Sequence, residues 1–281
     1  MSVAENVRIY GGDVVYGDIN EEKTYEWDLS EDFTGDINIM WSVCKKNVKQ
    51  WNLIIGVLGM MEKIGQVIYI ENLKTVIKKS ELKEYLEKRK IEYQLLKDMI
   101  DFLQEEKLVT FFCDSEEENI TISYKNGQVK KCLTKAGLVL EMKIYITAKN
   151  IIDSDGAFVY DDVVNGAVID WDSEFHNITD GEIDTENEID VLMMHGTVPV
   201  FISCKNGMVN ADELYKLNTV AERFGGENVK KILVATALSS LGGAEKYLRQ
   251  RAEDMNIKIL DDVHMLSDNE LEEKIRNLWH G

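Results

Sequence analysis

Two apolar runs separated by a short break occupy residues 186–207, ENEIDVLMMHGTVPVFISCKNG. Two runs rich in Val, Ile, Met and Phe flank His195 and Gly196, and this arrangement predicts a β-hairpin. Because side chains alternate along a strand, both faces of the first run are apolar except at Asp190, and Lys205 is a cation near the end of the second run. An isolated buried charge is costly, so we expect Asp190 and Lys205 on one face, near each other or near a bound cation. The simpler alternative is a strand-end ion pair.

Periodic apolar positions predict the other elements of this half. Helices should end at Gly225-Gly226 and begin at Ser267, where Glu270 completes a capping box. The predicted helices are 132–150, 212–224, 244–255 and 267–279, and the predicted strands around the hairpin are 158–164, 168–171, 231–237 and 257–260. The acids at 180–186 form a polar loop. The resulting element order begins αβββαβ, so the fold class is α/β.

The first half of the chain predicts a different order of strands and helices. Short β-like pieces at 7–10, 14–16 and 24–27 precede a strand at 37–41, a helix at 48–64 and a strand at 66–71, which together predict a βαβ unit with parallel strands.

Two further helices are predicted near 82–86 and 95–103, followed by strands at 108–113 and 119–124. Two helices and a hairpin are typical of a winged helix. The second helix and the turn carry many acids, which would repel a phosphate backbone. We therefore expect this segment to act as a spacer or a dimer contact.

Composition narrows the function classes. The 281 residues are 44% hydrophobic and 30% charged, a length that predicts two domains. No apolar run is long enough for a membrane span and no signal peptide is evident, so we expect a cytoplasmic protein that does not bind membranes. The four cysteines have no metal or disulfide spacing. The formal net charge of -19 argues against a broad phosphate-binding surface and favours a short or single-stranded substrate.

The hairpin resembles a known family. An acid, a gap of about a dozen residues and then x-x-Lys is the spacing of the PD-(D/E)xK nucleases. More narrowly, the strands resemble the CRISPR-associated family that joins a CARF ligand-sensing domain to such a nuclease, whose strands read NEIDVL and FIECKTG. The resemblance implies that Asp190 is a metal ligand and Lys205 the catalytic cation. The second acid of the family falls at Ser203, a poor metal ligand.

The resemblance also implies the remaining ligands of Mg²⁺ or Mn²⁺. Glu141 matches a glutamate that the first helix of this fold often supplies; alternatively, it is a flank carboxylate paired with a lysine. The backbone carbonyl of Cys204 would be a second oxygen donor. With Ser203 in the motif, the third oxygen could come from Glu188, Glu141 or Glu213, since some restriction enzymes of this fold take the acid from the following helix.

At the N-terminal side, the resemblance implies a truncated CARF-like domain. In that family a strand-to-helix loop binds a cyclic oligoadenylate, and the matching positions here are Ser42, Lys45, Lys46 and Asn47. The loop lacks the glycines of the family, so the alternative is a helix N-terminus with solvated lysines. Such a region could dimerise without sensing a ligand, and we expect a homodimer.

These interpretations divide the chain into a truncated CARF-like region at 1–72, a winged-helix-like linker at 73–130 and a PD-(D/E)xK nuclease-like domain at 131–281. The predicted function is a metal-dependent endonuclease that cleaves single-stranded DNA or RNA in CRISPR-linked or other antiviral defence. One alternative is a catalytically impaired pseudo-nuclease that acts as a binding or scaffold protein. A second alternative is a ligand-responsive DNA-binding regulator.

Overall fold

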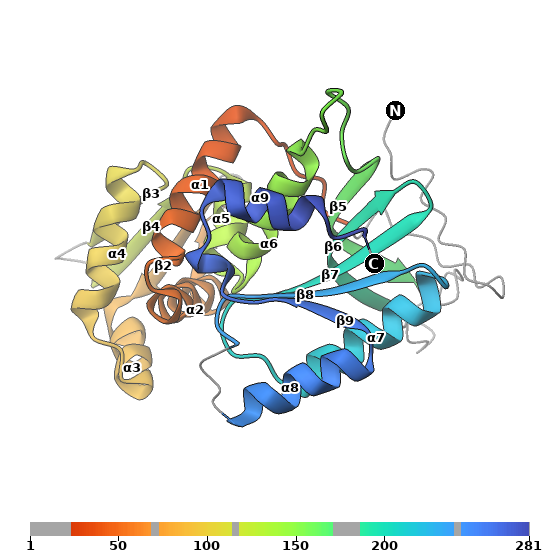
Figure 1. The fold of residues 1–281 in the computed structure, drawn as a ribbon. Helices are drawn as coiled ribbons and strands as arrows, with labels where there is room; N and C mark the ends of the chain where they lie inside the picture. Colours follow the sequence, from red (N-terminus) through yellow and green to blue (C-terminus); the bar gives the residue numbers. More distant parts are fainter. Residues whose placement is uncertain (1–23, 69–72, 114–117, 171–185, 239–242, 281) are drawn as a thin grey trace, which may run out of the picture. The chain divides into compact units, whose positions relative to one another are not determined.

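A computed structural model describes residues 24–68, 73–113, 118–170, 186–238 and 243–280. The fold is a mixed α/β fold, as expected (Figure 1). The chain forms two compact units, one of Trp27–Val139 and one of Met1–Glu26 with Leu140–Gly281. The predicted division at residues 72 and 130 stays a prediction, and the expected β-like pieces at 7–10 and 14–16 lie outside the described residues.

The first unit contains five helices and a four-stranded antiparallel sheet, with strand order β1-β2-β4-β3, among the residues described. Its elements are α1 (Glu31–Cys44), α2 (Val48–Ile64), β1 (Gln66–Ile68), β2 (Lys74–Lys78), α3 (Lys79–Arg89), α4 (Tyr93–Glu105), β3 (Val109–Cys113), β4 (Asn119–Tyr124) and α5 (Gly127–Thr134).

The strand predicted at 37–41 is wrong, because these residues lie within α1. The Ser30 side chain caps the helix by accepting a hydrogen bond from the Phe33 N–H. Apolar side chains then recur at helical spacing and are buried along one side of α1, which a five-residue β-like run conceals. They are Phe33, Ile37, Met40, Trp41 and Cys44.

The predicted βαβ unit is also wrong for the described residues, whereas the CARF-like assignment of this region stays a prediction. Helix α2 has the predicted bounds, but β1 pairs antiparallel with β2, through Gln66 and Val76. Helix α2 instead packs closely on α5: a Cβ added at Gly59 would lie 2.6 Å from the main-chain oxygen of Thr134. The unit is therefore built on helix packing against an antiparallel sheet.

Two helices and a hairpin follow β2 near the predicted positions. Helix α4 buries Leu96, Met99, Ile100 and Leu103 and leaves its acids exposed. Strands β3 and β4 pair from Val109 with Tyr124 to Cys113 with Ile120, and most of the acidic turn, 114–117, lies outside the described residues. The winged-helix assignment of these elements stays a prediction.

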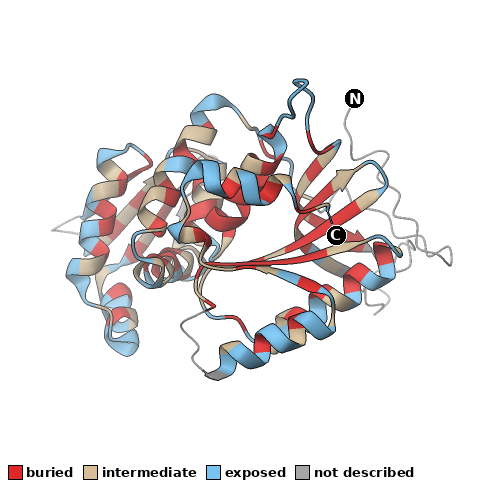
Figure 2. Ribbon diagram, in the orientation of Figure 1, coloured by how far each residue is buried: buried red, intermediate tan, exposed pale blue. Residues whose placement is uncertain are grey.

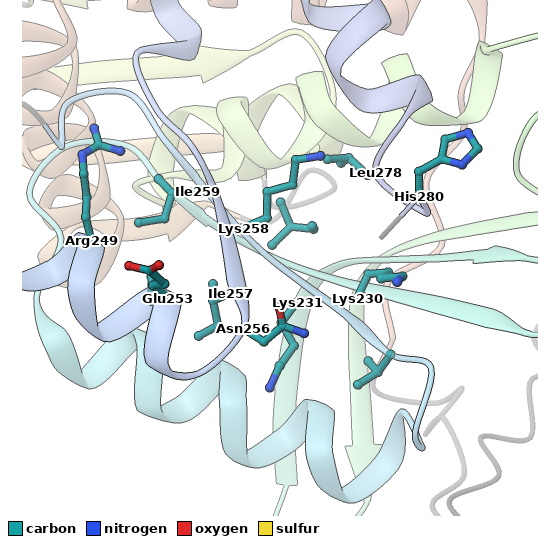
Figure 3. Close-up of a pocket in the computed structure, with 13 residues that line it drawn as sticks. Lys230, Lys231, Arg249, Glu253, Asn256, Ile257, Lys258, Ile259, Leu278 and His280 are labelled. Carbon is teal, nitrogen blue, oxygen red and sulfur yellow. The ribbon is translucent and has the colours of Figure 1, made fainter.

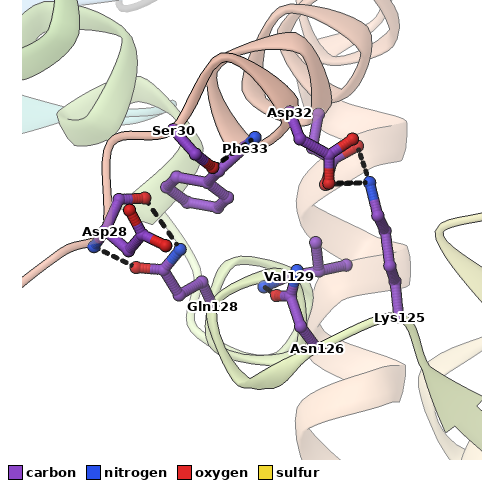
Figure 4. A network of polar contacts seen from close by, with 9 residues as sticks. Asp28, Ser30, Asp32, Phe33, Lys125, Asn126, Gln128 and Val129 are labelled. Carbon is purple, nitrogen blue, oxygen red and sulfur yellow. Dashed lines mark hydrogen bonds and ion pairs between the residues drawn. The ribbon is translucent and has the colours of Figure 1, made fainter.

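A polar network joins α1 to the turn between β4 and α5 (Figure 4). The Lys125 ammonium lies 2.8 Å from the Asp32 carboxylate and 2.9 Å from the buried Asp36 carboxylate. Beside it, the Asp28 N–H donates to Gln128 Oε1 at 2.7 Å. The Lys125 ammonium compensates the charge of Asp36, which helix packing buries.

The second unit is a five-stranded mixed sheet of order β5-β6-β7-β8-β9, flanked by helices. The first three strands pair antiparallel and the last three parallel, with β7 belonging to both sets. Its elements are α6 (Leu138–Asn150, of which the last eleven residues follow the unit boundary), β5 (Asp162–Asp170), β6 (Glu186–His195), β7 (Val198–Lys205), α7 (Ala211–Phe224), β8 (Lys230–Ala235), α8 (Gly243–Asp254), β9 (Ile257–Leu260) and α9 (Asp268–Arg276).

Helices α7 and α8 cover one face of this sheet and enclose its main apolar core (Figures 1 and 2). Phe201 and Leu233 from the strands are fully buried against Leu214, Phe224 and Ala252 from the two helices. The predicted hairpin, the helix at 212–224 and the edge strand at 257–260 are confirmed within a residue or so.

Two predicted boundaries in this half are wrong. The single helix at 132–150 is two helices, α5 and α6, because the chain breaks near Gly137, which has a φ of 89°. The strands at 158–164 and 168–171 are one strand, β5. The capping box of Ser267 and Glu270 is confirmed at α9. No described helix combines the length and apolar character that a membrane crossing requires.

Candidate functional site

A cavity of about 320 Å³ opens beside the inner strands of the second unit, at the start of α7. Its polar lining comprises Asn187, Glu188, Asp190, Ser203, Lys205, Glu213 and Lys216. The cavity lies where β6 and β7 separate, since their ladder ends at the pair Val191 and Ile202.

Asp190 occupies the point of separation. Its Oδ2 atom accepts a hydrogen bond from the Cys204 N–H at 2.6 Å and a longer one from the Ser203 hydroxyl at 3.3 Å. Its own main-chain carbonyl accepts a hydrogen bond from Asn165 Nδ2 at 2.8 Å. The side chains of Asp190 and Asn165 thus satisfy main-chain groups at a place where regular strand pairing has stopped.

The Asp190 carboxylate carries an incompletely compensated charge. Burial raises the pKa of Asp190, and the nearby charge of Glu188 raises it further. The Cys204 N–H, the Lys205 ammonium and the Ser203 hydroxyl lower the pKa, but they do not offset burial. A cation in the cavity would favour the ionised carboxylate.

Lys205 faces the same cavity and is held by an acid from α7. Its ammonium lies 2.9 Å from Glu213 Oε2, and both side chains are largely buried. Burial lowers the pKa of Lys205, but the charges of Asp190, Glu213 and Glu141 outweigh it, so the pKa is raised. The lysine therefore remains an ammonium at neutral pH.

Glu141 and Cys204 complete the surroundings. Glu141 is buried in α6, and its charge helps raise the pKa of both Lys205 and the Cys204 thiol. Burial is the largest cause of the increase for Cys204, whose pKa lies well above its ordinary value. The thiol is thus protonated at neutral pH and is a poor metal ligand, so the main-chain carbonyl oxygen is the ligand that Cys204 could offer.

The sequence-predicted site residues therefore converge. Asp190, Ser203, Lys205, Glu188 and Glu213 line one cavity, and Glu141 lies within electrostatic reach of it. Their chemical roles stay predictions.

The donor set fits a hydrated divalent ion better than an all-protein cage. Within the described ranges, no three His, Cys, Asp or Glu side chains gather closely enough to enclose a metal. Mg²⁺ usually keeps several waters and needs only one or two carboxylates. Asp190, whose ionised form lacks full compensation, and Glu188, which lines the same cavity, meet that requirement.

Two positions next to Asp190 were missed in the sequence. Asn165 is buried and supports the Asp190 main chain, and Gly166 has a φ of 62°. Gly166 lies opposite Asp190 in the register of β5 and β6. A polar Asn-Gly pair within an apolar strand is the signal that could have indicated them.

The expected ligand-binding residues Ser42, Lys45, Lys46 and Asn47 lie elsewhere, at the junction of α1 and α2. The Ser42 hydroxyl donates to the Ile39 carbonyl at 2.8 Å, and Asn47 Oδ1 accepts from the Gln50 N–H to cap α2. The junction joins two helices, so the predicted strand-to-helix loop is wrong.

No family model and no curated protein matches the chain. Solved structures do. The fold is similar to that of protein VC1899 from Vibrio cholerae, with a TM-score of 0.59, 18% identity, and coverage of 94% of this chain and 58% of that one. Can2 from Sulfobacillus thermosulfidooxidans, solved in complex with cyclic tetra-adenylate (cA4), has a TM-score of 0.49 and 15% identity over 84% of this chain and 56% of its own. The chain thus spans little more than half the length of each. At this identity the VC1899 likeness establishes the fold and not the activity.

Proposed function

We propose that the chain is a metal-dependent endonuclease that cleaves single-stranded DNA or RNA. The observation that carries this proposal is the presence of Asp190 and Lys205 in one cavity at the diverging ends of β6 and β7. The order α6, β5, β6, β7, α7, β8 supports it, because it is the αβββαβ order of the PD-(D/E)xK nucleases that the hairpin resembles.

Each residue of the cavity would have a separate role in cleavage. The Cys204 N–H and the Ser203 hydroxyl hold the Asp190 carboxylate in position, and Glu213 holds the Lys205 ammonium. Lys205 would bind an oxygen of the scissile phosphate and add positive charge where negative charge develops.

Mg²⁺ or Mn²⁺ would be held by Asp190, by Glu188 or Glu141, and by the main-chain carbonyl of Cys204. When bound, the ion would supply charge stabilisation and a water of lowered pKa. Glu213 is a less suitable ligand because its carboxylate already pairs with Lys205.

The test is cleavage of end-labelled single-stranded DNA and RNA with Mn²⁺, comparing wild type with Asp190→Ala. We expect cleavage by the wild type, its loss on chelation, and a decrease of about 100-fold or more in the variant. Cleavage by Asp190→Ala at the wild-type rate would refute the site.

A second candidate is a pseudo-nuclease that binds nucleic acid or a partner. The observation favouring it is Ser203 at the position of the motif acid, where it donates to Asp190 rather than supplying a second carboxylate. Ser203→Glu separates the two candidates. An inert wild type that gains strong Mn²⁺-dependent cleavage with Ser203→Glu supports the pseudo-nuclease; an active wild type supports the endonuclease.

The family resemblance also supports a role in CRISPR-linked antiviral defence, with the winged-helix-like segment as a spacer or dimer contact in a homodimer. The acidic surface of α4, in the winged-helix-like segment, counts against the alternative of a DNA-binding regulator. Activation by a cyclic oligoadenylate is tested by adding cyclic tetra-adenylate to the cleavage assay. A rise in rate would support ligand sensing, and an unchanged rate would argue against it.

A further inference from the structure

A second hollow lies at the outer edge of the sheet of the same unit (Figure 3). It has a volume of about 570 Å³ and runs beside β9, the end strand of the sheet, between α8 and the C-terminal residues. Basic side chains predominate in its lining, with Glu253 as the acid among them. These basic residues are Lys230, Lys231, Arg249, Lys258 and His280, and we call this hollow the basic groove.

Two of the cations already have acidic partners. Arg249 contacts Glu245 at 2.8 Å and Asp261 at 2.7 Å. Lys231 is buried and lies 3.3 Å from Glu222 of α7. These two side chains carry no surplus charge for a ligand.

Lys230 and Lys258 differ from them. Neither forms an ion pair with any residue in the described part of the chain. The strand register places both on one face, because Lys258 pairs with Ile232, two positions after Lys230. Figure 3 shows Lys231 directed away from Lys258, toward α7. The groove thus presents two uncompensated ammonium groups on a chain of net charge -19.

The floor beside these lysines is apolar and aromatic. Ile232 and Leu278 line the groove, and the exposed His280 ring lies against Trp279, with the ring centroids 3.6 Å apart and the planes tilted by 33°. Spaced cations beside a ring face are what a single nucleic-acid strand uses, with phosphates on the cations and bases against the ring. An anionic membrane surface would need a broader cluster of lysines.

We propose that the basic groove binds single-stranded nucleic acid through Lys230, Lys258 and the face of His280. The choice of a nucleic-acid strand over another polyanion rests on the proposed nuclease function. The groove lysines are separate from the cavity: Val200 pairs with Lys230 and Lys205 with Ala235, so Lys230 lies five residues along β8 from the level of Lys205 and, by strand alternation, on the opposite face of the sheet. That separation is about 17 Å along the strand.

The experiment measures binding without cleavage. Fluorescence anisotropy of a labelled single-stranded oligonucleotide is followed in EDTA across a range of salt, for the wild type and for the Lys230→Glu/Lys258→Glu double variant. We expect the dissociation constant to rise about tenfold or more, and the slope of log affinity against log salt to shrink by about one to two, as for two lost phosphate contacts. The Lys88→Glu/Lys274→Glu double variant, at exposed positions of α3 and α9 outside the groove lining, makes the matched charge change and should bind like the wild type.

Lys230→Gln/Lys258→Gln repeats the test without charge reversal if the first variant unfolds. Wild-type affinity and salt slope in the folded double variant would overturn the proposal. So would lysine-dependent binding to vesicles containing phosphatidylserine without binding to the oligonucleotide.

The Mn²⁺ cleavage assay keeps the two proposals apart. If the protein binds the oligonucleotide through the two lysines but does not cleave it, the nuclease proposal is overturned and the groove proposal is supported. If the protein cleaves but its binding does not depend on either lysine, the nuclease proposal is supported and the groove proposal is overturned.

Discussion

Lys205 and Lys231 form an internal comparison. They lie on neighbouring strands, on the same face of the sheet, and each pairs with an acid from α7. Lys205 contacts Glu213 at 2.9 Å near the start of the helix, whereas Lys231 contacts Glu222 at 3.3 Å near its end. By pair geometry alone the two lysines look alike.

Their surroundings distinguish them. Lys231 has a second fixed partner, the side-chain oxygen of Asn218 at 2.7 Å. Lys205 instead shares a cavity with Asp190, a partly buried carboxylate of raised pKa. A lysine paired with an acid is therefore informative about function only when a further, incompletely compensated charge lies beside it.

Replacing each lysine by an uncharged residue should give the largest difference in cleavage rate between the two positions. We expect Lys205→Met to slow Mn²⁺-dependent cleavage of a short single strand by about 100-fold, which corresponds to about 2.7 kcal/mol of transition-state stabilisation. Lys231→Met should cleave within about twofold of the wild type, because Lys231 does not line the cavity and its partner Glu222 is exposed enough to remain hydrated without it. Initial rates check both, and equal losses would contradict the comparison.

Replacing the two acids of α7, Glu213 and Glu222, should also give different cleavage rates, with the larger loss at Glu213, but the difference should be smaller than for the lysines. We expect Glu213→Gln to slow cleavage by up to about tenfold, because Lys205 loses its positioning partner. Glu213 also raises the pKa of Lys205, so in this variant the alkaline loss of activity should begin at lower pH. Glu222→Gln is the matched control and should leave the pH-rate profile unchanged. A larger loss for Glu222→Gln would mean that the roles are reversed.

Asp190 should lower the stability of the fold at neutral pH. Its pKa in the folded state is above the ordinary value, so ionisation destabilises the metal-free fold as pH rises through that interval. We expect Asp190→Asn to raise the free energy of unfolding at pH 7 by about 1 kcal/mol, or the melting temperature by about 2–4 °C. This gain should vanish below about pH 4, where both states are protonated. Urea denaturation at the two pH values measures it; a variant less stable than wild type at pH 7 would count against the unrelieved charge.

The sequence predicted the second unit well because its signals are local. Strand alternation placed Asp190 and Lys205 on one face, and apolar spacing with terminal glycines gave α7. It did not predict that Asp190 would bond the Cys204 N–H, since that contact depends on where β6 and β7 separate.

The first unit was predicted less well. The residues 37–41 favour a strand when considered alone, but the Ser30 cap and the apolar positions from Phe33 to Cys44 fold them as a helix. The pairing direction of β1 depends on β2, a strand that no local pattern had indicated. The predicted strand-to-helix loop depended on the strand at 37–41 and is therefore wrong, whereas the predicted cavity residues do not depend on these elements.

The most direct test of the central claim is a crystal of the protein soaked in Mn²⁺ and measured at the manganese absorption edge. We predict an anomalous peak in the cavity at coordination distance, about 2.0–2.2 Å, from the Asp190 carboxylate, with the Cys204 carbonyl also in range and Lys205 beside it. An open cavity without such a peak, or a peak bound by residues other than Asp190, would contradict the account.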